Sequence, residues 1–134
     1  MGAWGCGAFE NDDSGDWLDQ LQETSDTSII ADALQHVASL GDEYLEEPHS
    51  SYAIVAAEIV AALRGHPVSE LDETAQEWVA SHRSLSVVSL VPTALAAIQR
   101  VRTNSELKEL WDDSPEAANW YAMLDDICTR LNAK

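Results

Sequence analysis

Positive charge is scarce in this sequence. The chain of 134 residues carries seven Lys and Arg residues against 24 Asp and Glu residues, which gives a formal net charge of −17. Such a field repels phosphate backbones, anionic lipid surfaces and acidic ligands, so we expect no nucleic-acid and no membrane partner. A basic protein would instead be attracted and steered toward the surface. Solubility alone is the alternative explanation, because acidic charge keeps many proteins dissolved.

Cysteines and long apolar runs are also few. The two cysteines, Cys6 and Cys128, lie near opposite ends of the chain and do not have the spacing of a zinc site. The longest apolar run is interrupted by Glu58 and is too short to cross a bilayer. Residues 1–20 contain acids and no basic region of a secretory signal. These features predict a cytoplasmic protein in a reducing compartment, which folds without disulfides.

Patterns that would carry catalysis or bind a cofactor are missing. The histidines are scattered along the sequence without metal-ligand spacing. The acidic turn at residues 10–15 resembles the start of a calcium loop, but the final bidentate carboxylate of that loop would fall on Leu21. The glycines at positions 2, 5 and 7 lack the Lys-Ser/Thr of a phosphate loop. We therefore expect no metal, no cofactor and no enzymatic activity.

Helical periodicity dominates the rest of the chain. The sequence is 46% hydrophobic and contains five tryptophans, which is typical of a packed globular domain. We expect an all-α fold, a compact single-domain bundle of six or seven helices over residues 12–134, with an ordered glycine-rich arm over residues 1–11. The first expected helix is capped by Asp12, Asp13 or Ser14, the second spans 27–40 with Gly41 as its stop, and the third spans 52–64. The next begins near Ser69–Asp72, and a longer one spans 87–103. A short segment at 106–111 is capped by Ser105, and a last helix ends the chain.

Prolines and serines set several expected helix boundaries. Pro48 breaks the pattern, and either Ser50 or Ser51 then caps the helix at 52–64. This helix is apolar on nearly every side, so we expect it at the centre of the fold. The pair Ser114-Pro115 is an N-cap followed by a first-turn proline, and it opens the last helix. Pro92 lies either in the first turn of its helix or at a kink.

Glu58 is the most unusual single residue, because all its neighbours from Ala56 to Ala62 are apolar. A buried carboxylate is costly unless it is paired or hydrogen-bonded. As a structural residue, Glu58 would accept backbone N–H bonds from the glycine-rich arm or pair with an arginine. As a functional residue, it would be a general acid or base with a raised pKa. We favour the structural role, because no second catalytic group presents itself.

Clusters of acidic residues are the candidates for binding a partner. Solvated helix faces are the alternative explanation for these clusters. The candidate partner-binding residues are Asp42, Glu43, Glu46, Glu47, Asp112 and Asp113.

Three segments of the sequence are similar to a known family. The opening MGAWGCGAFENDD, the middle YLEEP with AIVAAEIVAALRG, and the late SELKELWDDS resemble the bacterial family called domain of unknown function 4259. The resemblance runs from Met1 into the last helix and implies a small cytoplasmic protein without an assigned activity. Cys6 stands where similar sequences lead us to expect Thr, which argues against a role for its thiol. The family-like residues are Gly2, Trp4, Gly5, Gly7, Phe9, Asn11, Asp12, Tyr44, Glu46, Pro48, Glu58, Glu106, Leu107 and Trp111.

The sequence therefore predicts a non-catalytic acidic protein that binds a basic protein partner, as an immunity protein or antitoxin binds a toxin. Blocking a partner in this way requires complementary surface and fast association, not chemistry. Two alternatives remain open: an accessory interaction module of a larger bacterial assembly, and a small enzyme that uses Glu58.

Overall fold

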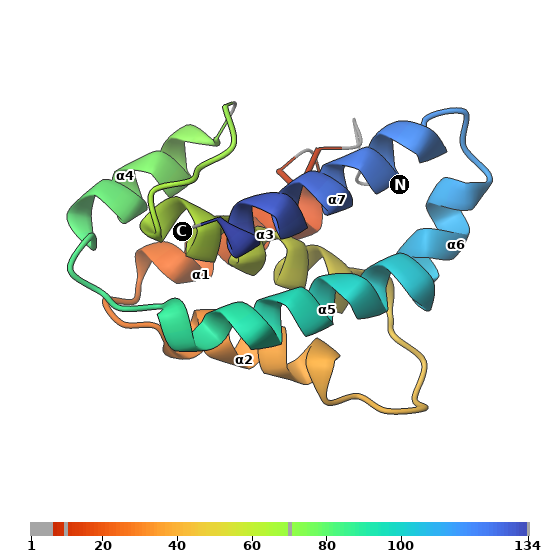
Figure 1. Cartoon of the computed structure of the whole chain (residues 1–134), viewed down its shortest axis with the longest axis horizontal. Helices are drawn as coiled ribbons and strands as arrows, with labels where there is room; N and C mark the ends of the chain where they lie inside the picture. The colour runs from red at the N-terminus through yellow and green to blue at the C-terminus, as the bar shows by residue number, and fades with distance from the viewer. Residues whose placement is uncertain (1–6, 10, 70, 134) are drawn as a thin grey trace.

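The computed structural model describes residues 7–9, 11–69 and 71–133, and over these residues the chain is all-α, as predicted. Within these ranges there are seven α-helices, one short 3₁₀ helix and no β-strand (Figure 1). The helices are α1 (Asp12–Gln22), α2 (Ser28–Ala38), α3 (Glu47–Leu63), α4 (Glu73–Ser81), the 3₁₀ helix η1 (Val88–Leu90), α5 (Val91–Thr103), α6 (Glu106–Asp112) and α7 (Ala117–Asn132).

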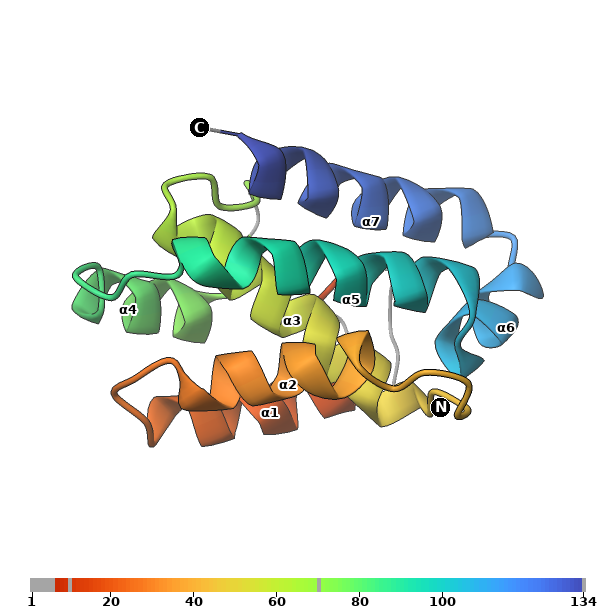
Figure 2. The same cartoon turned by 60° about the horizontal axis from the view of Figure 1, so that its bottom comes forward.

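Helix α3 is the centre of the bundle and packs against each of the other α-helices. It crosses the interior obliquely, with α7 on one side and α1 and α2 on the other (Figure 2). Residues 50–62 of this helix are buried without interruption, apart from the partly buried Tyr52. The prediction of a central helix apolar on nearly every side is therefore confirmed, and its alanines let neighbouring helices approach closely.

The first turns of α1 and α3 differ from the predictions. Asn11, not a residue from 12 to 14, caps α1: its side chain accepts a 2.8 Å hydrogen bond from the Ser14 N–H. The buried hydroxyl of Ser14 donates instead to the Ala8 carbonyl, at 2.8 Å. Helix α3 begins at Glu47, because Pro48 stands in its first turn, where the missing N–H has no helical partner to lose. The prediction that Pro48 breaks the pattern and that Ser50 or Ser51 caps this helix was wrong, because both serines are buried inside the helix.

Later helix starts show similar shifts. Asp72 caps α4, where its carboxylate accepts hydrogen bonds from the Thr74 and Ala75 N–H groups. Pro92 lies in the first turn of α5, which settles its place. Ser114 accepts a bond from the Glu116 N–H within a turn, so α7 begins at Ala117 and the predicted Ser114-Pro115 cap was wrong.

Two further helix ends bear on the site described below. Helix α2 stops at Ala38, and Gly41 lies in the following loop with a φ of 68°, a conformation that favours glycine. Ser105 caps α6, as predicted, by accepting a bond from the Lys108 N–H. In the part of the chain that the structure describes, no helix is long and apolar enough to span a membrane.

Candidate partner-binding surface

The six candidate acids occupy three different settings. Asp42, Glu43 and Glu46 are exposed on the loop of residues 39–46, called the α2–α3 loop below. Asp112 and Asp113 are exposed at the end of α6. Glu47 is half-buried as the first residue of α3.

The α2–α3 loop is bound to α6. The Glu106 N–H donates to the Leu45 carbonyl at 2.9 Å, and the Glu106 carboxylate accepts a 2.8 Å bond from the Glu47 N–H. The Tyr44 hydroxyl donates to the Glu109 carboxylate at 2.6 Å. Figures 1 and 2 both place the loop beside α6 at one end of the molecule. The structure thus brings the candidate acids of the loop and those of α6 to the same end.

Two apolar side chains are exposed among these acids. Tyr44 is 55% exposed and Leu110, on α6, is 39% exposed. Exposed apolar groups surrounded by charge are typical of protein-binding surfaces. We call this surface the acidic edge; it consists of Asp42, Glu43, Tyr44, Glu46, Glu106, Glu109 and Leu110. Sequence reasoning did not single out Glu109 and Leu110, although the i, i+3 spacing of Glu106 and Glu109 places both carboxylates on one helix face.

Tyr44 stays protonated at this edge. Its hydrogen bond to Glu109 raises the pKa of the phenol to about 12, and burial and the negative charges of Glu109, Glu106 and Glu46 act in the same direction. The hydroxyl is therefore a fixed donor to Glu109 at physiological pH. This bond holds the aromatic ring in place between the loop and α6.

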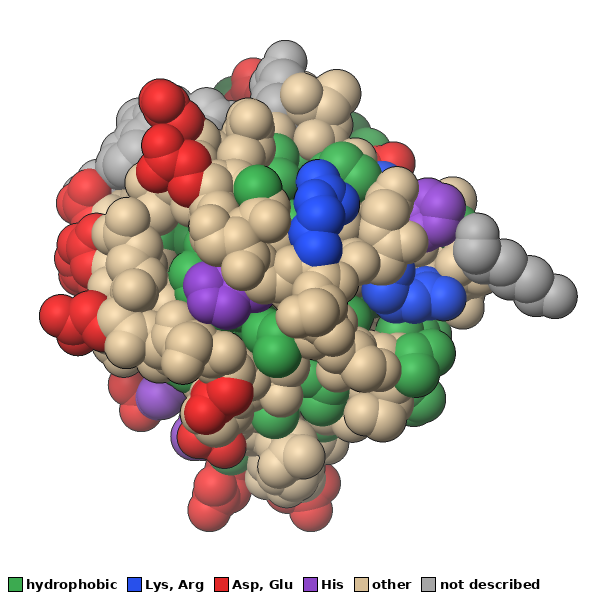
Figure 3. All heavy atoms as spheres, turned by 90° about the vertical axis from the view of Figure 1, so that its left-hand side faces the viewer, with side chains coloured by type: hydrophobic (Ala, Val, Ile, Leu, Met, Phe, Trp, Pro, Cys, Tyr) green, Lys and Arg blue, Asp and Glu red, His purple; other side chains and the backbone are tan. Residues whose placement is uncertain are grey.

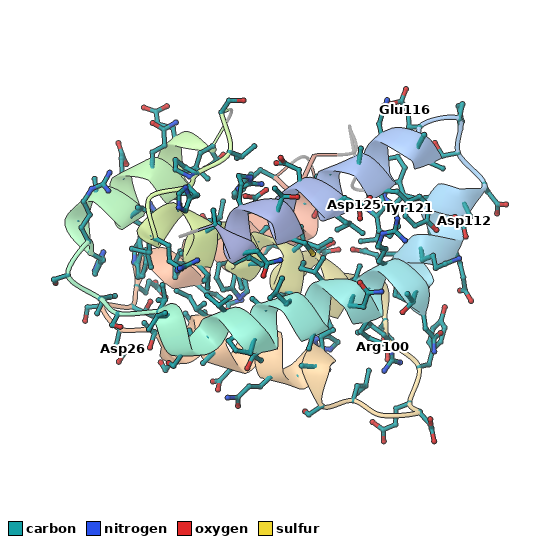
Figure 4. The ribbon with its side chains drawn as sticks, viewed as in Figure 1. Asp26, Arg100, Asp112, Glu116, Tyr121 and Asp125 are labelled. Atoms are coloured by element: carbon teal, nitrogen blue, oxygen red, sulfur yellow. The ribbon has the colours of Figure 1, made fainter. Side chains whose placement is uncertain are left out.

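Arg100 of α5 supports the backbone of the loop. Its guanidinium donates to the carbonyls of Gly41 at 2.6 Å, Glu43 at 2.5 Å and Asn104 at 2.8 Å. Figure 4 shows Arg100 between α5 and the α2–α3 loop. All these bonds go to carbonyl oxygens, so the arginine fixes the path of the loop and leaves its carboxylates facing solvent.

The two acids at the end of α6 are less available. Asp112 accepts hydrogen bonds from the Lys108 ammonium and from the Tyr121 hydroxyl, each at 2.7 Å (Figure 4). Lys108 first, and then Tyr121, lower the pKa of Asp112. This carboxylate already joins α6 to α7. Asp113 follows as the C-cap of α6 and is exposed.

Glu47 also has partners of its own. Its carboxylate accepts a 2.8 Å bond from the Ser51 hydroxyl. Burial and a hydrogen bond with Asp13 of α1 raise the pKa of Glu47 to about 7, and the Ser51 bond opposes them. Glu47 therefore belongs to the junction of α1 and α3 more than to the exposed edge.

Positive charge is unevenly distributed along the chain. Residues 1–63 contain no Lys or Arg, and the first basic residue is Arg64. Several later basic side chains are engaged: Arg64 donates to the carbonyls of Leu131 and Ala133, and Arg102 pairs with Asp125 at 2.8 Å. Figure 3 shows acidic side chains along one side of the visible face, with Lys and Arg toward the other. This asymmetry could be read from the sequence, but the prediction used only the total charge.

Glu58 is paired with Arg130 of α7. The carboxylate accepts bonds of 2.7 and 3.1 Å from the two terminal nitrogens of the guanidinium, and Glu58 is 1% exposed. Burial raises the pKa of Glu58, and the bonds and charge of Arg130 oppose that shift. Pairing with an arginine, one of the two arrangements expected for a structural Glu58, is therefore what the structure shows. This pair attaches α7 to the central helix.

Other family-like residues pack against the hydrophobic core or lie at the start of a helix. Phe9 packs against the core, and Trp111 is partly buried against the same core. Asn11 caps α1, and Asp12 is exposed in its first turn, where negative charge is favourable. Gly2, Trp4 and Gly5 lie outside the described residues.

The histidines are not all apart in space. The rings of His36 and His49 lie with their centroids 4.1 Å apart and their planes tilted by 32°. The spacing of 13 positions gave no sign of this pair, because it depends on α2 and α3 packing side by side. Among residues 7–9, 11–69 and 71–133, no three His, Cys, Asp or Glu side chains are placed to hold a metal ion together.

These observations define a small helical protein with an acidic edge. Residues 2–123 match the family described as Domain of unknown function (DUF4259), and the chain belongs to this family. The resemblance found in the sequence is thereby confirmed. No curated protein and no solved structure matches the chain.

Proposed function

We propose that this protein is a non-catalytic binding protein whose acidic edge docks a basic protein partner. The observation that carries the proposal is the exposure of Tyr44 and Leu110 among carboxylates at one end of the molecule. The loop acids Asp42, Glu43 and Glu46 are exposed to solvent, so a cationic partner can reach them directly. Tyr44 and Leu110 supply the apolar contact on the same surface.

In this proposal the carboxylates and the apolar side chains of the acidic edge affect different steps of binding. The carboxylates accelerate association with a basic partner, and this effect weakens as salt rises. The tyrosine ring and the leucine side chain are the groups whose burial slows dissociation. Tyrosine also offers its ring face to Lys or Arg side chains of the partner. A basic protein with an apolar patch between its cations fits this surface best.

Inhibition of a basic protein by occlusion is the activity such a surface supports, in the manner of an immunity protein or antitoxin. Glu58 is buried and held by two bonds to Arg130, which favours the binding role over an enzyme that uses this carboxylate.

Affinity capture from a lysate of the protein's own source tests the proposal. The tagged wild-type chain is compared with the edge variant, Asp42→Asn with Glu43→Gln and Glu46→Gln. The matched control is Asp16→Asn with Asp19→Asn and Glu23→Gln, which removes the same number of exposed charges from α1 and its C-cap. At near-physiological salt, we expect the wild type and the control to retain one basic protein and the edge variant to lose it. Equal retention by all three proteins would contradict the proposal.

A further inference from the structure

The His36–His49 pair lies at the base of the α2–α3 loop. His36 is in the last turn of α2 and His49 in the first turn of α3, so the paired rings join the two ends of the segment that carries Asp42, Glu43 and Glu46. The Tyr52 ring meets the His49 ring edge-on, with centroids 5.9 Å apart. The loop is thus held at its base by two imidazoles and along its length by Arg100 and Tyr44.

We propose that the His36–His49 pair is a proton-sensitive clasp, which closes the α2–α3 loop when at most one ring is protonated and opens it when both are. Opening moves the loop, with its acids and Tyr44, away from α6 and Leu110, so acidification to about pH 5.5 weakens binding of the basic partner. This inference rests on the proposed function, of which it is a form of regulation.

The geometry explains why one proton is tolerated and two are not. His36 stands at the C-terminal end of α2, where the helix dipole favours a cation, whereas His49 stands at the N-terminal end of α3, where the dipole disfavours one. A single proton on the pair leaves the close arrangement intact, because only one of the two rings is then charged. A second proton on His49 places two like charges on rings 4.1 Å apart, and their repulsion favours separation of the rings.

The surrounding charges set the pH of this transition. Burial first, and then the charge of His36, lower the pKa of His49, while Glu46 on the loop opposes them. From α3, the Tyr52 phenol faces the pair, and burial and the charges of Asp13 and Asp16 on α1 raise the pKa of that phenol, so it stays neutral. Arg100 of α5 is bound to carbonyls within the loop.

The direction of the pH effect follows from these positions. Because the pKa of His49 is lower in the closed state than in an open, solvated one, the closed state is favoured above the ordinary histidine pKa of about 6.5. It is lost as the pH falls through the lowered pKa of His49. Glu47 has a pKa of about 7, so it also titrates when the pH falls from 7.5 to 5.5. Its effect on the pH dependence of the loop must therefore be separated from that of the histidines.

Hydrogen exchange of the loop in the free protein tests the clasp. The Glu47→Gln chain serves as the background, and amide exchange over residues 39–46 is measured from pH 7.5 to 5.5 and corrected for the intrinsic pH dependence of exchange. We expect loop protection to fall at least about tenfold across this range. With His49→Gln added, protection of the loop should no longer depend on pH.

His82→Gln is the control variant, because the ring of His82 stacks on Trp78 instead, and it should leave the pH dependence of loop protection unchanged. Loop protection that is flat with pH, or an unchanged dependence in His49→Gln, would overturn the clasp.

A binding measurement separates the clasp from the proposed function. A lysine-rich peptide is titrated into the same proteins at pH 7.5 and 5.5. We expect affinity for the background protein to fall at the lower pH and the affinity of His49→Gln to change less than about twofold. If the peptide binds the edge variant as well as the wild type at pH 7.5, the proposed docking surface fails, while the exchange result still decides the clasp.

Discussion

Glu58 of α3 and Arg130 of α7 form a bidentate ion pair beneath the protein surface, and Arg130 also donates to Asp126 at 2.8 Å. The side chain of Arg130 is 14% exposed, so the guanidinium is largely withdrawn from water together with its partner. Such a pair contributes little compared with apolar residues of the same shape, but removing one member leaves a buried charge without compensation.

Arg130→Met should therefore destabilise the fold by about 3–5 kcal/mol. The double variant Glu58→Met with Arg130→Met should recover most of this loss, because it leaves no buried charge unpaired and Asp126 is exposed to solvent. Urea denaturation of the wild type, the single variant and the double variant measures the difference. If the single variant unfolds within about 1 kcal/mol of the wild type, the pair does not hold α7 as described.

Glu47→Gln should stabilise the fold above pH 7. The raised pKa of Glu47 means that its ionised form is disfavoured in the folded state, so this residue costs stability as the pH rises from about 4.5 to about 7. A shift of this size in a fully buried group corresponds to about 3 kcal/mol, and partial exposure reduces the expected gain to about 1 kcal/mol. The urea midpoint, followed from pH 4 to 8, should coincide with that of the wild type near pH 4, diverge progressively as the pH rises to about 7, and differ by a constant amount above it. Glu77→Gln, an exposed change on α4, should show no such divergence.

Arg100→Met should loosen the α2–α3 loop without unfolding the protein. The variant loses the donors to the carbonyls of Gly41 and Glu43, so amides of the loop should exchange at least about fivefold faster. Arg83→Met, an exposed change beside α4, is the matched control and should leave loop exchange as it is. Unchanged exchange in Arg100→Met would mean that the guanidinium does not position the loop.

The sequence predicted the fold wherever periodicity carried the information. The continuous apolar character around Glu58 identified α3 as the buried centre, and Ser105 correctly marked the start of α6. Boundaries failed where a single residue has two roles: Pro48 stops a preceding helix as readily as it opens the next one, and Ser114 caps a turn instead of α7.

The candidate site was less predictable than the fold, because it is built from contacts between segments that are distant in the sequence. Tyr44 and Glu109 are 65 positions apart, and nothing local indicates their hydrogen bond. An arginine was one of the partners expected for Glu58, but sequence alone did not choose among the basic residues. The paired histidines likewise follow only from the side-by-side packing of α2 and α3. By contrast, the absence of Lys and Arg before Arg64 was visible in the sequence, and the α2–α3 loop lies within that stretch.

The central claim is that the acidic edge docks a basic partner, and the dissociation constant of the captured protein tests it most directly. The constant is measured at near-physiological salt for the wild type, for the edge variant and for the α1 control with the same charge change. The proposal predicts a dissociation constant at least about tenfold larger for the edge variant than for the wild type, and a change of less than about twofold for the control. Equal weakening in both variants would show that total charge, not the edge built on Tyr44 and its neighbouring carboxylates, governs binding.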